Sequence, residues 1–233
     1  MLMKPLALAA GLTLGVGLAA ALAVDQTQGA AAGAQAQTPP GGRTGAPQPD
    51  PKKPQKLEIA PGTKARYRVT EQLAGIDFPS DAVGTTESIT GAIIVNPDGS
   101  IAAASKITID LRTLVSDQAL RDNYIQTRTL ETGKFPLMSV VPKRTVGLPA
   151  PLPAGNQAQA GFQLVADVTL HGVTKETTWN VVATFRGDGV AGRATTTVDF
   201  ALFNMTKPTL ARLLSVDDTI HLEIEFRCTR TVQ

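Results

Sequence analysis

Few residues of this chain could do acid–base chemistry. Its 233 residues include two histidines, His171 and His221, and a Ser-His-Asp arrangement would have to use one of them. Neither histidine has neighbours that mark it as a general base, and the sequence contains no G-x-S-x-G motif. We therefore predict no catalytic residue and a protein that is not an enzyme.

Metal and phosphate chemistry has equally little support. The sequence has no C-x-x-C pair, no H-x-x-x-H pair and no EF-hand loop. Asp217 and Asp218 form an isolated acidic pair, which we expect to meet a basic neighbour such as Arg212 or to cap a backbone turn. A dinucleotide-binding loop would need a G-x-G-x-x-G followed by a helix, whereas Gly187-Asp-Gly189 is typical of a hairpin turn. We predict no metal site and no resident cofactor.

Composition excludes other classes of partner. A formal net charge of +2 is too small to favour nucleic acid, and an aromatic content of 4% leaves few side chains on which bases could stack. The single cysteine, Cys228, cannot form an internal disulfide. Its place among apolar residues indicates a small buried side chain rather than a reactive thiol.

Strict alternation of apolar and polar residues marks the stretch from Thr219 to Arg230. One face carries Ile220, Leu222, Ile224, Phe226 and Cys228, and the other carries His221, Glu223, Glu225, Arg227 and Thr229. Alternation with a period of two predicts a strand with one face in water and the other against apolar material.

The same alternation recurs along the chain. It predicts further strands over residues 65–70, 83–95, 101–111, 137–146, 162–170, 177–185 and 194–202. Asn96-Pro-Asp-Gly99 predicts a hairpin turn, and Pro142 would suit only an edge or a bulge of its strand. Ser116 can cap a short helix that reaches about Asn123.

Sequential hairpins of this kind predict an all-β fold. The expected architecture is an antiparallel up-and-down barrel of about eight strands, with one short helix and covering loops. A closed barrel leaves no open sheet edge. A sandwich of two sheets has much the same pattern and is the alternative.

The N-terminal quarter differs in composition from the rest. Residues 1–23 are predicted to be a signal peptide cut after Ala23, or else an uncleaved membrane anchor. Residues 24–56, rich in Pro, Gly and Ala, are predicted to be a disordered linker, and residues 57–233 the folded domain. Both alternatives place the domain outside the cytoplasm, periplasmic or secreted, and the anchor would tether it to a membrane.

Four pieces of the folded domain match a known family in the family's order. They are Ser105-Lys-Ile-Thr-Ile-Asp110-Leu with Ser116-Asp117 and Arg121-Asp122-Asn-Tyr124, Thr129-Leu-Glu-Thr-Gly-Lys-Phe135-Pro136, Val168-Thr-Leu170-His171-Gly172-Val173-Thr174-Lys175, and Phe203-Asn-Met205 with Val216-Asp217-Asp218-Thr-Ile220-His-Leu222. The set resembles the YceI-like proteins, often called periplasmic polyisoprenoid- or lipid-binding proteins. The resemblance implies a lipocalin-like barrel that holds an isoprenoid, quinone-like lipid or other amphiphile, with no established enzymatic activity.

This chain departs from the family's pattern in two places. Many members carry a histidine near the first strand, where this chain has Tyr67-Arg-Val-Thr-Glu71-Gln. Asn204 stands where a glycine is usual. Both departures affect the expected ligand more than the expected fold.

The predicted site is the inward face of the strands, which would form an apolar cavity. Its predicted lining is Tyr67, Ile89, Ile107, Ile109, Phe135, Leu164, Val168, Leu170, Trp179, Val181, Phe200, Met205, Leu210, Leu213, Leu222, Ile224 and Phe226. Leu210, Leu213 and Leu214 would form an apolar lid. Arg121 and Arg128 are candidates to contact a headgroup, with ion pairs to Asp122 or Glu131 as the alternative.

Two functions follow from this site. The first is an extracytoplasmic carrier for an apolar isoprenoid-like lipid or other amphiphile, since each buried methylene contributes roughly 0.8 kcal/mol. The alternative is a structural or stress-related interaction module whose barrel is filled by its own side chains. The sequence is compatible with a homodimer and predicts no nucleic-acid partner.

Overall fold

The computed structural model of the chain describes residues 49–154 and 157–233. The predicted signal peptide or anchor and all but the last residues of the predicted linker lie outside this part. Within it, no helix has the length and apolar character needed to cross a membrane. The first strand begins at Gln55, a buried residue, so regular structure starts inside the segment predicted as linker.

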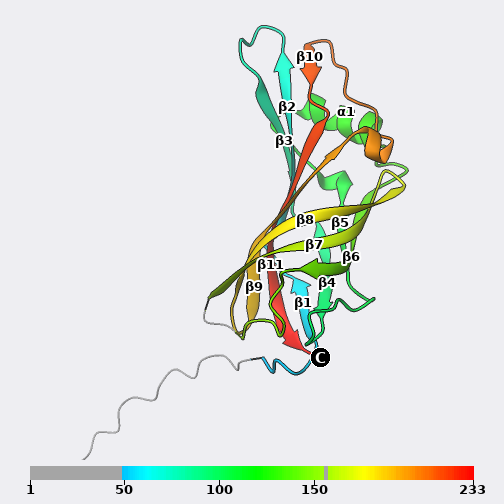
Figure 1. The fold of residues 1–233 in the computed structure, drawn as a ribbon. Coiled ribbons are helices and arrows are strands. Elements are labelled where there is room, and N and C mark those ends of the chain that lie inside the picture. Colours follow the sequence, from blue (N-terminus) through cyan, green and yellow to red (C-terminus); the bar gives the residue numbers. More distant parts are fainter. Residues whose placement is uncertain (1–48, 155–156) are drawn as a thin grey trace, which may run out of the picture. The chain divides into compact units, whose positions relative to one another are not determined.

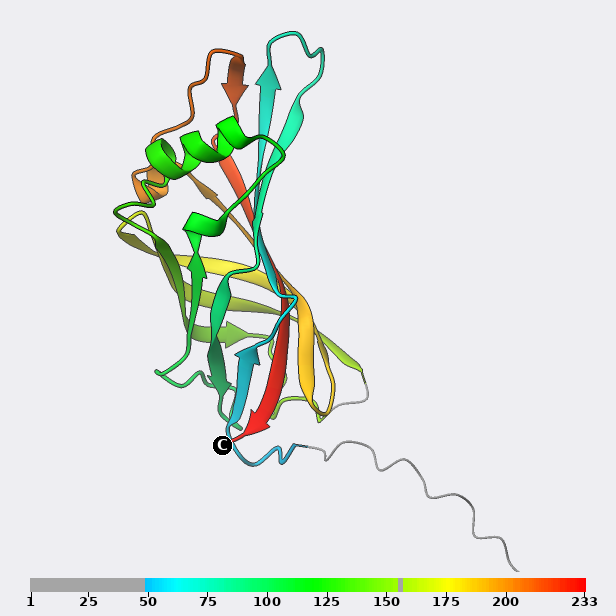
Figure 2. The ribbon, with the colours of Figure 1, turned by 180° about the vertical axis from the view of Figure 1, so that it is seen from behind.

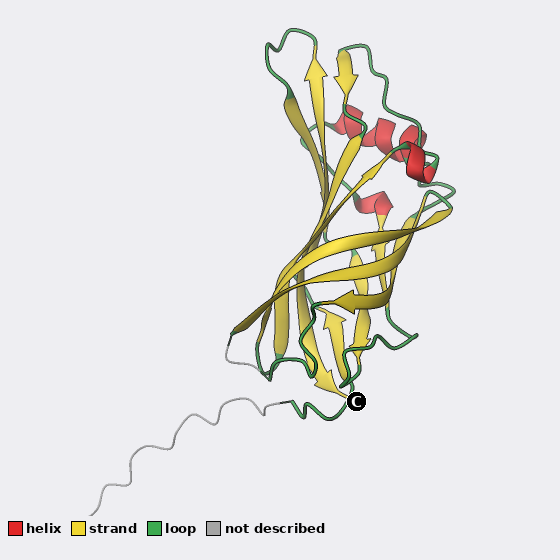
Figure 3. Ribbon diagram, in the orientation of Figure 1, coloured by secondary structure: helices red, strands yellow, loops and turns green. Residues whose placement is uncertain are grey.

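The described chain is built mainly of antiparallel strands (Figures 1 and 3). They are β1 (Gln55–Ile59), β2 (Lys64–Leu73), β3 (Ser80–Thr86), β4 (Ile89–Val95), β5 (Lys106–Asp110), β6 (Leu137–Val146), β7 (Ala158–Leu170), β8 (Val173–Phe185), β9 (Gly189–Asp199), β10 (Leu213–Val216) and β11 (Thr219–Val232). Hydrogen bonds run in the order β1-β4-β5-β6-β7-β8-β9-β11, and β11 pairs back onto β1. This closes an eight-strand barrel, which confirms the predicted fold and excludes the sandwich.

Two positions in the barrel are each occupied by two consecutive strands, β1 with β2 and β3 with β4. β11 pairs with β2 along its first half and with β1 along its second half. β3 pairs with β2 just as β4 pairs with β1. The β1–β2 and β3–β4 segments therefore each act as one long strand, and the up-and-down order of the barrel is preserved from one end to the other.

Helical turns interrupt the meander at the end of the barrel where β2, β3 and β10 project (Figure 2). They are η1 (Leu111–Thr113), α1 (Ala119–Tyr124), η2 (Ile125–Thr129) and η3 (Ala201–Phe203). We call residues 111–136 the covering segment, and we call this end the upper end. The opposite, lower end holds β1 and the last residues of β11 (Figure 1).

The short helix begins later than predicted. Ser116 does not cap it, because the residue before the helix is Gln118, which makes no capping bond through its side chain. The Ser116 hydroxyl instead donates to Asp122 Oδ1 over 2.6 Å and accepts from the Gln118 amide over 3.2 Å. This pair of bonds ties the helix to the turn that precedes it.

Strand bounds also differ from the prediction. The single strand expected over 83–95 is divided into β3 and β4, and β10 lies in a segment expected to be a loop. The strand expected over 101–111 begins at Lys106, and Ile101 makes only an isolated bridge to Val95. The strand expected over 194–202 ends at Asp199, whose carboxylate accepts from the Leu202 amide over 2.6 Å and starts the η3 turn. The predicted bulge is confirmed, because the register of β6 shifts just after Pro142.

Candidate functional site

The barrel interior contains two hollows that its own side chains do not fill. The space open to the centre of a water-sized sphere is about 120 Å³ in the upper cavity and about 100 Å³ in the lower cavity. A single water needs roughly 10–15 Å³ in this measure, so each hollow is several waters in size. Both walls are almost entirely apolar, which favours hydrocarbon over water.

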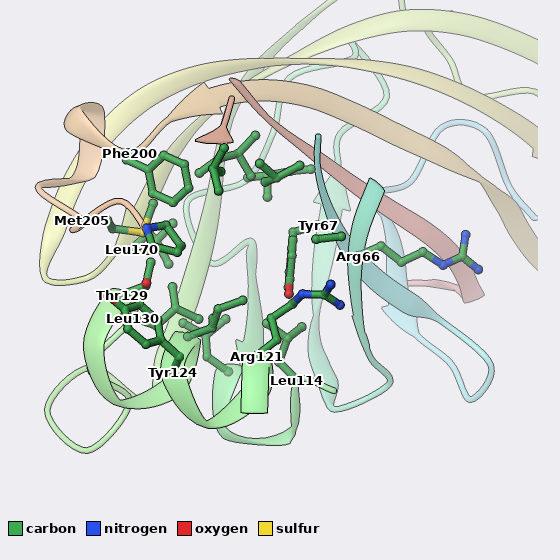
Figure 4. Close-up of a pocket in the computed structure, with 18 of the residues that line it drawn as sticks. Arg66, Tyr67, Leu114, Arg121, Tyr124, Thr129, Leu130, Leu170, Phe200 and Met205 are labelled. Atoms are coloured by element: carbon green, nitrogen blue, oxygen red, sulfur yellow. The ribbon is translucent and has the colours of Figure 1, made fainter. Parts of the chain in front are cut away.

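The upper cavity lies between the upper barrel strands and the covering segment (Figure 4). Of the predicted lining, it includes Tyr67, Ile109, Leu170, Phe200, Met205, Leu210, Leu213 and Leu222. Arg66 also borders it, but its guanidinium points away in Figure 4 and pairs with Glu223 and Glu225 over 2.9 and 3.0 Å. Its wall thus combines residues of several strands, of which β2 contributes the most, with residues of helical turns and loops.

The lower cavity lies between the lower parts of the barrel strands. Of the predicted lining, it includes Ile107, Leu164, Trp179, Val181, Ile224 and Phe226. Cys228 lines it as well, and burial raises the pKa of its thiol to about 12. This raised pKa agrees with the prediction that Cys228 is a buried side chain rather than a reactive thiol.

Three residues predicted to line the cavity line neither hollow. Ile89 and Val168 are 7% and 0% exposed and pack within the core, where the wall between the hollows leaves no space beside them. Phe135 leaves the interior, because its ring packs edge-on against His171 with centroids 4.8 Å apart. The predicted apolar cavity is therefore divided into an upper and a lower hollow, and we call the packed region between them the waist.

Several lining residues lie outside the strands and were not predicted. Leu114, Ile125 and Leu130 reach the upper cavity from the covering segment. Leu148 and Leu152 reach the lower cavity from the Pro/Gly-rich loop between β6 and β7. Their only signal in the sequence is an apolar residue in a segment without a regular period, which gives no direction for the side chain.

A small charged cluster borders the upper cavity. Arg121 lies with its side chain 12% exposed, and its guanidinium donates to Glu71 Oε1 over 2.5 Å and to the Asp117 carboxylate. The Glu71 side chain is 8% exposed. Burial lowers the pKa of Arg121, but its two carboxylate partners raise that pKa by more, so the guanidinium stays charged.

The two arginines predicted to contact a headgroup have different positions. Arg121 borders the upper cavity, but its partners are Glu71 and Asp117 rather than the expected Asp122. Arg128 is exposed and lines neither cavity, and it makes no ion pair within residues 49–154 and 157–233. The structure thus leaves Arg121 as the single arginine of the pair at the site.

Among the hydroxyl-bearing residues that line this cavity, Thr129 and Tyr67 have hydroxyls without a hydrogen-bond partner in the described chain. Thr129 is 4% exposed, and its Oγ1 finds no hydrogen-bond partner among the described residues. Tyr67 makes no side-chain hydrogen bond to the described chain, and burial raises its pKa, which keeps the phenol neutral. In Figure 4, Tyr67 lies beside Arg121 and Thr129 lies on the other side of the cavity.

His171 holds the covering segment against the barrel. Its Nε2 lies 2.9 Å from Glu131 Oε2 and its Nδ1 lies 3.2 Å from the Phe203 carbonyl oxygen. Gly172 follows it with φ +74°, and a Cβ there would meet the Phe135 ring at 2.6 Å, so the turn requires glycine. His171 is therefore a structural contact, and no serine or aspartate completes a catalytic arrangement with it in the described chain.

Only two of the three leucines predicted to form an apolar lid contact the upper cavity. Leu210 and Leu213 line the upper cavity, but Leu214 is 67% exposed and points away from it. Leu214 is the extra residue where the pairing of β10 with β2 shifts its register between Leu213 and Ser215. Asp218 meets a basic neighbour as expected, but this neighbour is Lys207, over 2.8 Å, rather than Arg212.

Solved structures with a similar fold are known. A polyisoprenoid binding domain from Saccharophagus degradans implicated in plant cell wall breakdown is 12% identical, covers 76% of this chain and 98% of its own, and has a TM-score of 0.56. BcnA from Burkholderia cenocepacia is 13% identical, covers 71% of this chain and 95% of its own, and has a TM-score of 0.54.

A third neighbour is the YceI protein of Campylobacter jejuni, 17% identical, which covers 68% of this chain and 90% of its own with a TM-score of 0.52. No curated protein matches the sequence. The model of one family, described as the YceI-like domain, matches residues 62–228, well over half of the chain. The chain therefore belongs to the YceI-like family.

Proposed function

We propose that this protein is an extracytoplasmic carrier that holds an apolar isoprenoid-like lipid, or another amphiphile with a long chain, inside its barrel. The observation that carries the proposal is the pair of apolar hollows enclosed by a closed barrel. A neighbour of the same fold is described as a polyisoprenoid binding domain, which supports the same class of ligand. The protein acts by binding rather than by catalysis.

The mechanism rests on burial of hydrocarbon. Each methylene removed from water into such a cavity contributes roughly 0.8 kcal/mol, so a long chain binds without polar specificity along its length. The covering segment, fixed by His171 and Glu131, shields the upper cavity from water. Release of the ligand then requires that the covering segment, or the loop between η3 and β10, move away from the cavity.

The direct test is to identify what the purified protein carries. We would express the full chain in a bacterial host, extract the folded protein with organic solvent, and analyse the extract and the intact protein by mass spectrometry. The expected result is a bound amphiphile at near-stoichiometric amount. A protein that carries no lipid and binds none when isoprenoid alcohols are added would contradict the proposal and favour the interaction module.

Matched variants make this test specific for the interior. A double variant, Ala65→Phe with Ala194→Phe, adds a ring to the wall of each hollow, since Ala65 lines the upper cavity and Ala194 the lower. It should lose the bound lipid. Val182→Phe is the control, because Val182 is 61% exposed on the outer face of β8 and should leave the bound lipid unchanged.

The proposed compartment needs its own measurement. The sequence up to Ala23 is the reason to expect export. Cell fractionation followed by intact-mass analysis should find the protein outside the cytoplasm, with Val24 as first residue if the leader is cut, or in the membrane fraction with its leader if it is not. A cytoplasmic protein with an intact N-terminus would contradict export.

A further inference from the structure

We propose, on the basis of the carrier function above, that the upper cavity selects an amphiphile whose polar group is uncharged. The group would be a hydroxyl or carbonyl that pairs with the side-chain hydroxyl of Thr129 on one side of the cavity or with that of Tyr67 on the other. Lipids that end in a carboxylate or a phosphate would be rejected by the carboxylates around Arg121. Three features of the site carry this proposal.

The first is the buried hydroxyl of Thr129. The residue lines the upper cavity, is 4% exposed and leaves its Oγ1 without a partner among the described residues. A buried polar atom without a hydrogen bond is rare in folded proteins, because it has lost water and gained nothing in return. A ligand hydroxyl or carbonyl in the cavity would supply the missing bond.

The second is the phenol of Tyr67. It also lines the upper cavity, and none of the described residues hydrogen bonds to it. Since burial raises its pKa, the group stays protonated and can donate to a ligand oxygen. In Figure 4 the two hydroxyls lie on different sides of the cavity, so a ligand has one neutral hydrogen-bonding group available at each side.

The third is an excess of negative charge around Arg121, the arginine whose guanidinium lies beside Tyr67. Glu71 and Asp117 both pair with Arg121, and the Asp122 carboxylate nearby accepts from the Ser116 amide and hydroxyl over 2.9 and 2.6 Å. The guanidinium is therefore already engaged, and three carboxylates surround one cation. An anionic headgroup would have to displace Glu71, which would leave a buried carboxylate unpaired.

The test compares ligands that share one chain and differ in the polar group. Geranylgeraniol, geranylgeranoic acid and geranylgeranyl diphosphate would compete with the fluorescent probe N-phenyl-1-naphthylamine for the delipidated full-length protein. We expect the alcohol to bind at least tenfold more tightly than the acid or the diphosphate. Equal or tighter binding of either anion would overturn the selection of uncharged ligands while leaving the carrier function intact.

Variants separate the contribution of each group. Thr129→Val, which keeps the shape of the side chain, should weaken binding of the alcohol about fivefold. Thr127→Val is its control, because the Thr127 hydroxyl is exposed and donates to the Asn123 carbonyl in the same segment. If both valine variants bind the alcohol as the original protein does, Thr129 has no part in recognition and its role is overturned.

A charge-removing variant tests the rejection of anions. Glu71→Gln should tighten binding of geranylgeranoic acid about tenfold relative to the original protein, with little change for the alcohol. Asp81→Asn is the control, since Asp81 pairs with Arg68 and both are solvent-exposed. An unchanged preference in a folded Glu71→Gln protein would overturn the electrostatic part. If neither the probe nor any of the three ligands binds, the carrier function itself fails.

Discussion

The upper and lower cavities are similar in size but differ in what surrounds them. The upper cavity is bordered by two arginines, a glutamate, two tyrosines and two threonines, and part of its wall comes from helical turns and loops. The lower cavity is bordered by side chains of the barrel strands and of two loops, with Thr145 as its one hydroxyl among the described residues. Under the proposed function, this difference assigns polar selection to the upper cavity and hydrocarbon alone to the lower one.

The largest expected effect comes from the wall of the lower cavity. Trp179 is 2% exposed, and its indole N–H donates to Thr177 Oγ1 over 2.9 Å. Trp179→Ala should lower the free energy of unfolding by about 3–5 kcal/mol, because it removes a large buried side chain and enlarges a hollow. Leu213→Ala in the upper wall should lower it by about 1 kcal/mol. Urea denaturation measures both, and equal losses would contradict the expected difference between the fully buried Trp179 and the half-buried Leu213.

Chemical modification of Cys228 reports on the lower cavity. Since burial raises the pKa of this thiol to about 12, its thiolate fraction at pH 8 is roughly a thousandfold below that of a thiol with an ordinary pKa near 9. Iodoacetamide should therefore label the folded protein far more slowly than the urea-unfolded protein, as followed by intact mass. Rapid labelling of the folded protein would show that the lower hollow is open to water.

Filling one hollow at a time tests the division of roles. Ala194→Phe narrows the lower cavity and should weaken binding of long isoprenoid alcohols about tenfold while sparing short ones. Ala65→Phe narrows the upper cavity and should weaken short and long alcohols alike. Dissociation constants for a series of chain lengths provide the measurement. Identical profiles for the two variants would remove the distinction between the hollows.

The smallest expected effect concerns acid stability at the upper end. The hydrogen bond from Lys134 and then that from His171 lower the pKa of Glu131 below its ordinary value near 4.5. A lowered folded-state pKa contributes stability above the unfolded pKa, and this contribution is lost as pH falls through the folded value. Glu131→Gln should thus reduce the loss of stability between pH 6 and pH 3 by a small amount in urea titrations. An unchanged loss would mean that this contact does not hold the covering segment.

The barrel could be predicted from the sequence because its signal is local. Alternation along residues 219–230 identifies the faces of β11 without any knowledge of neighbouring strands, and the inward residues of that strand do line the two cavities. The turn at Asn96–Gly99 forms as expected, with Gly99 at φ +85°. Each of these features depends on a few consecutive residues.

The division of the interior could not be predicted in this way. Val168 belongs to the inward face, and only the packing of strands distant in sequence shows that no space remains beside it. The pairing of Arg121 with Glu71 joins residues 50 positions apart, so no local pattern favours it over the nearer Asp122. That ligands contact the lining residues stays a prediction until one is found.

The pairing of β1 with the end of β11 has a practical consequence. Gln55 lies opposite Val232 in the sheet, so the described chain enters and leaves the barrel at the lower end. The charged cluster and the covering segment lie at the other end (Figure 1). An affinity tag or a linkage to a solid support at the C-terminus would therefore lie at the end opposite the charged cluster. Under the proposed function, immobilised protein should exchange its ligand as freely as protein in solution.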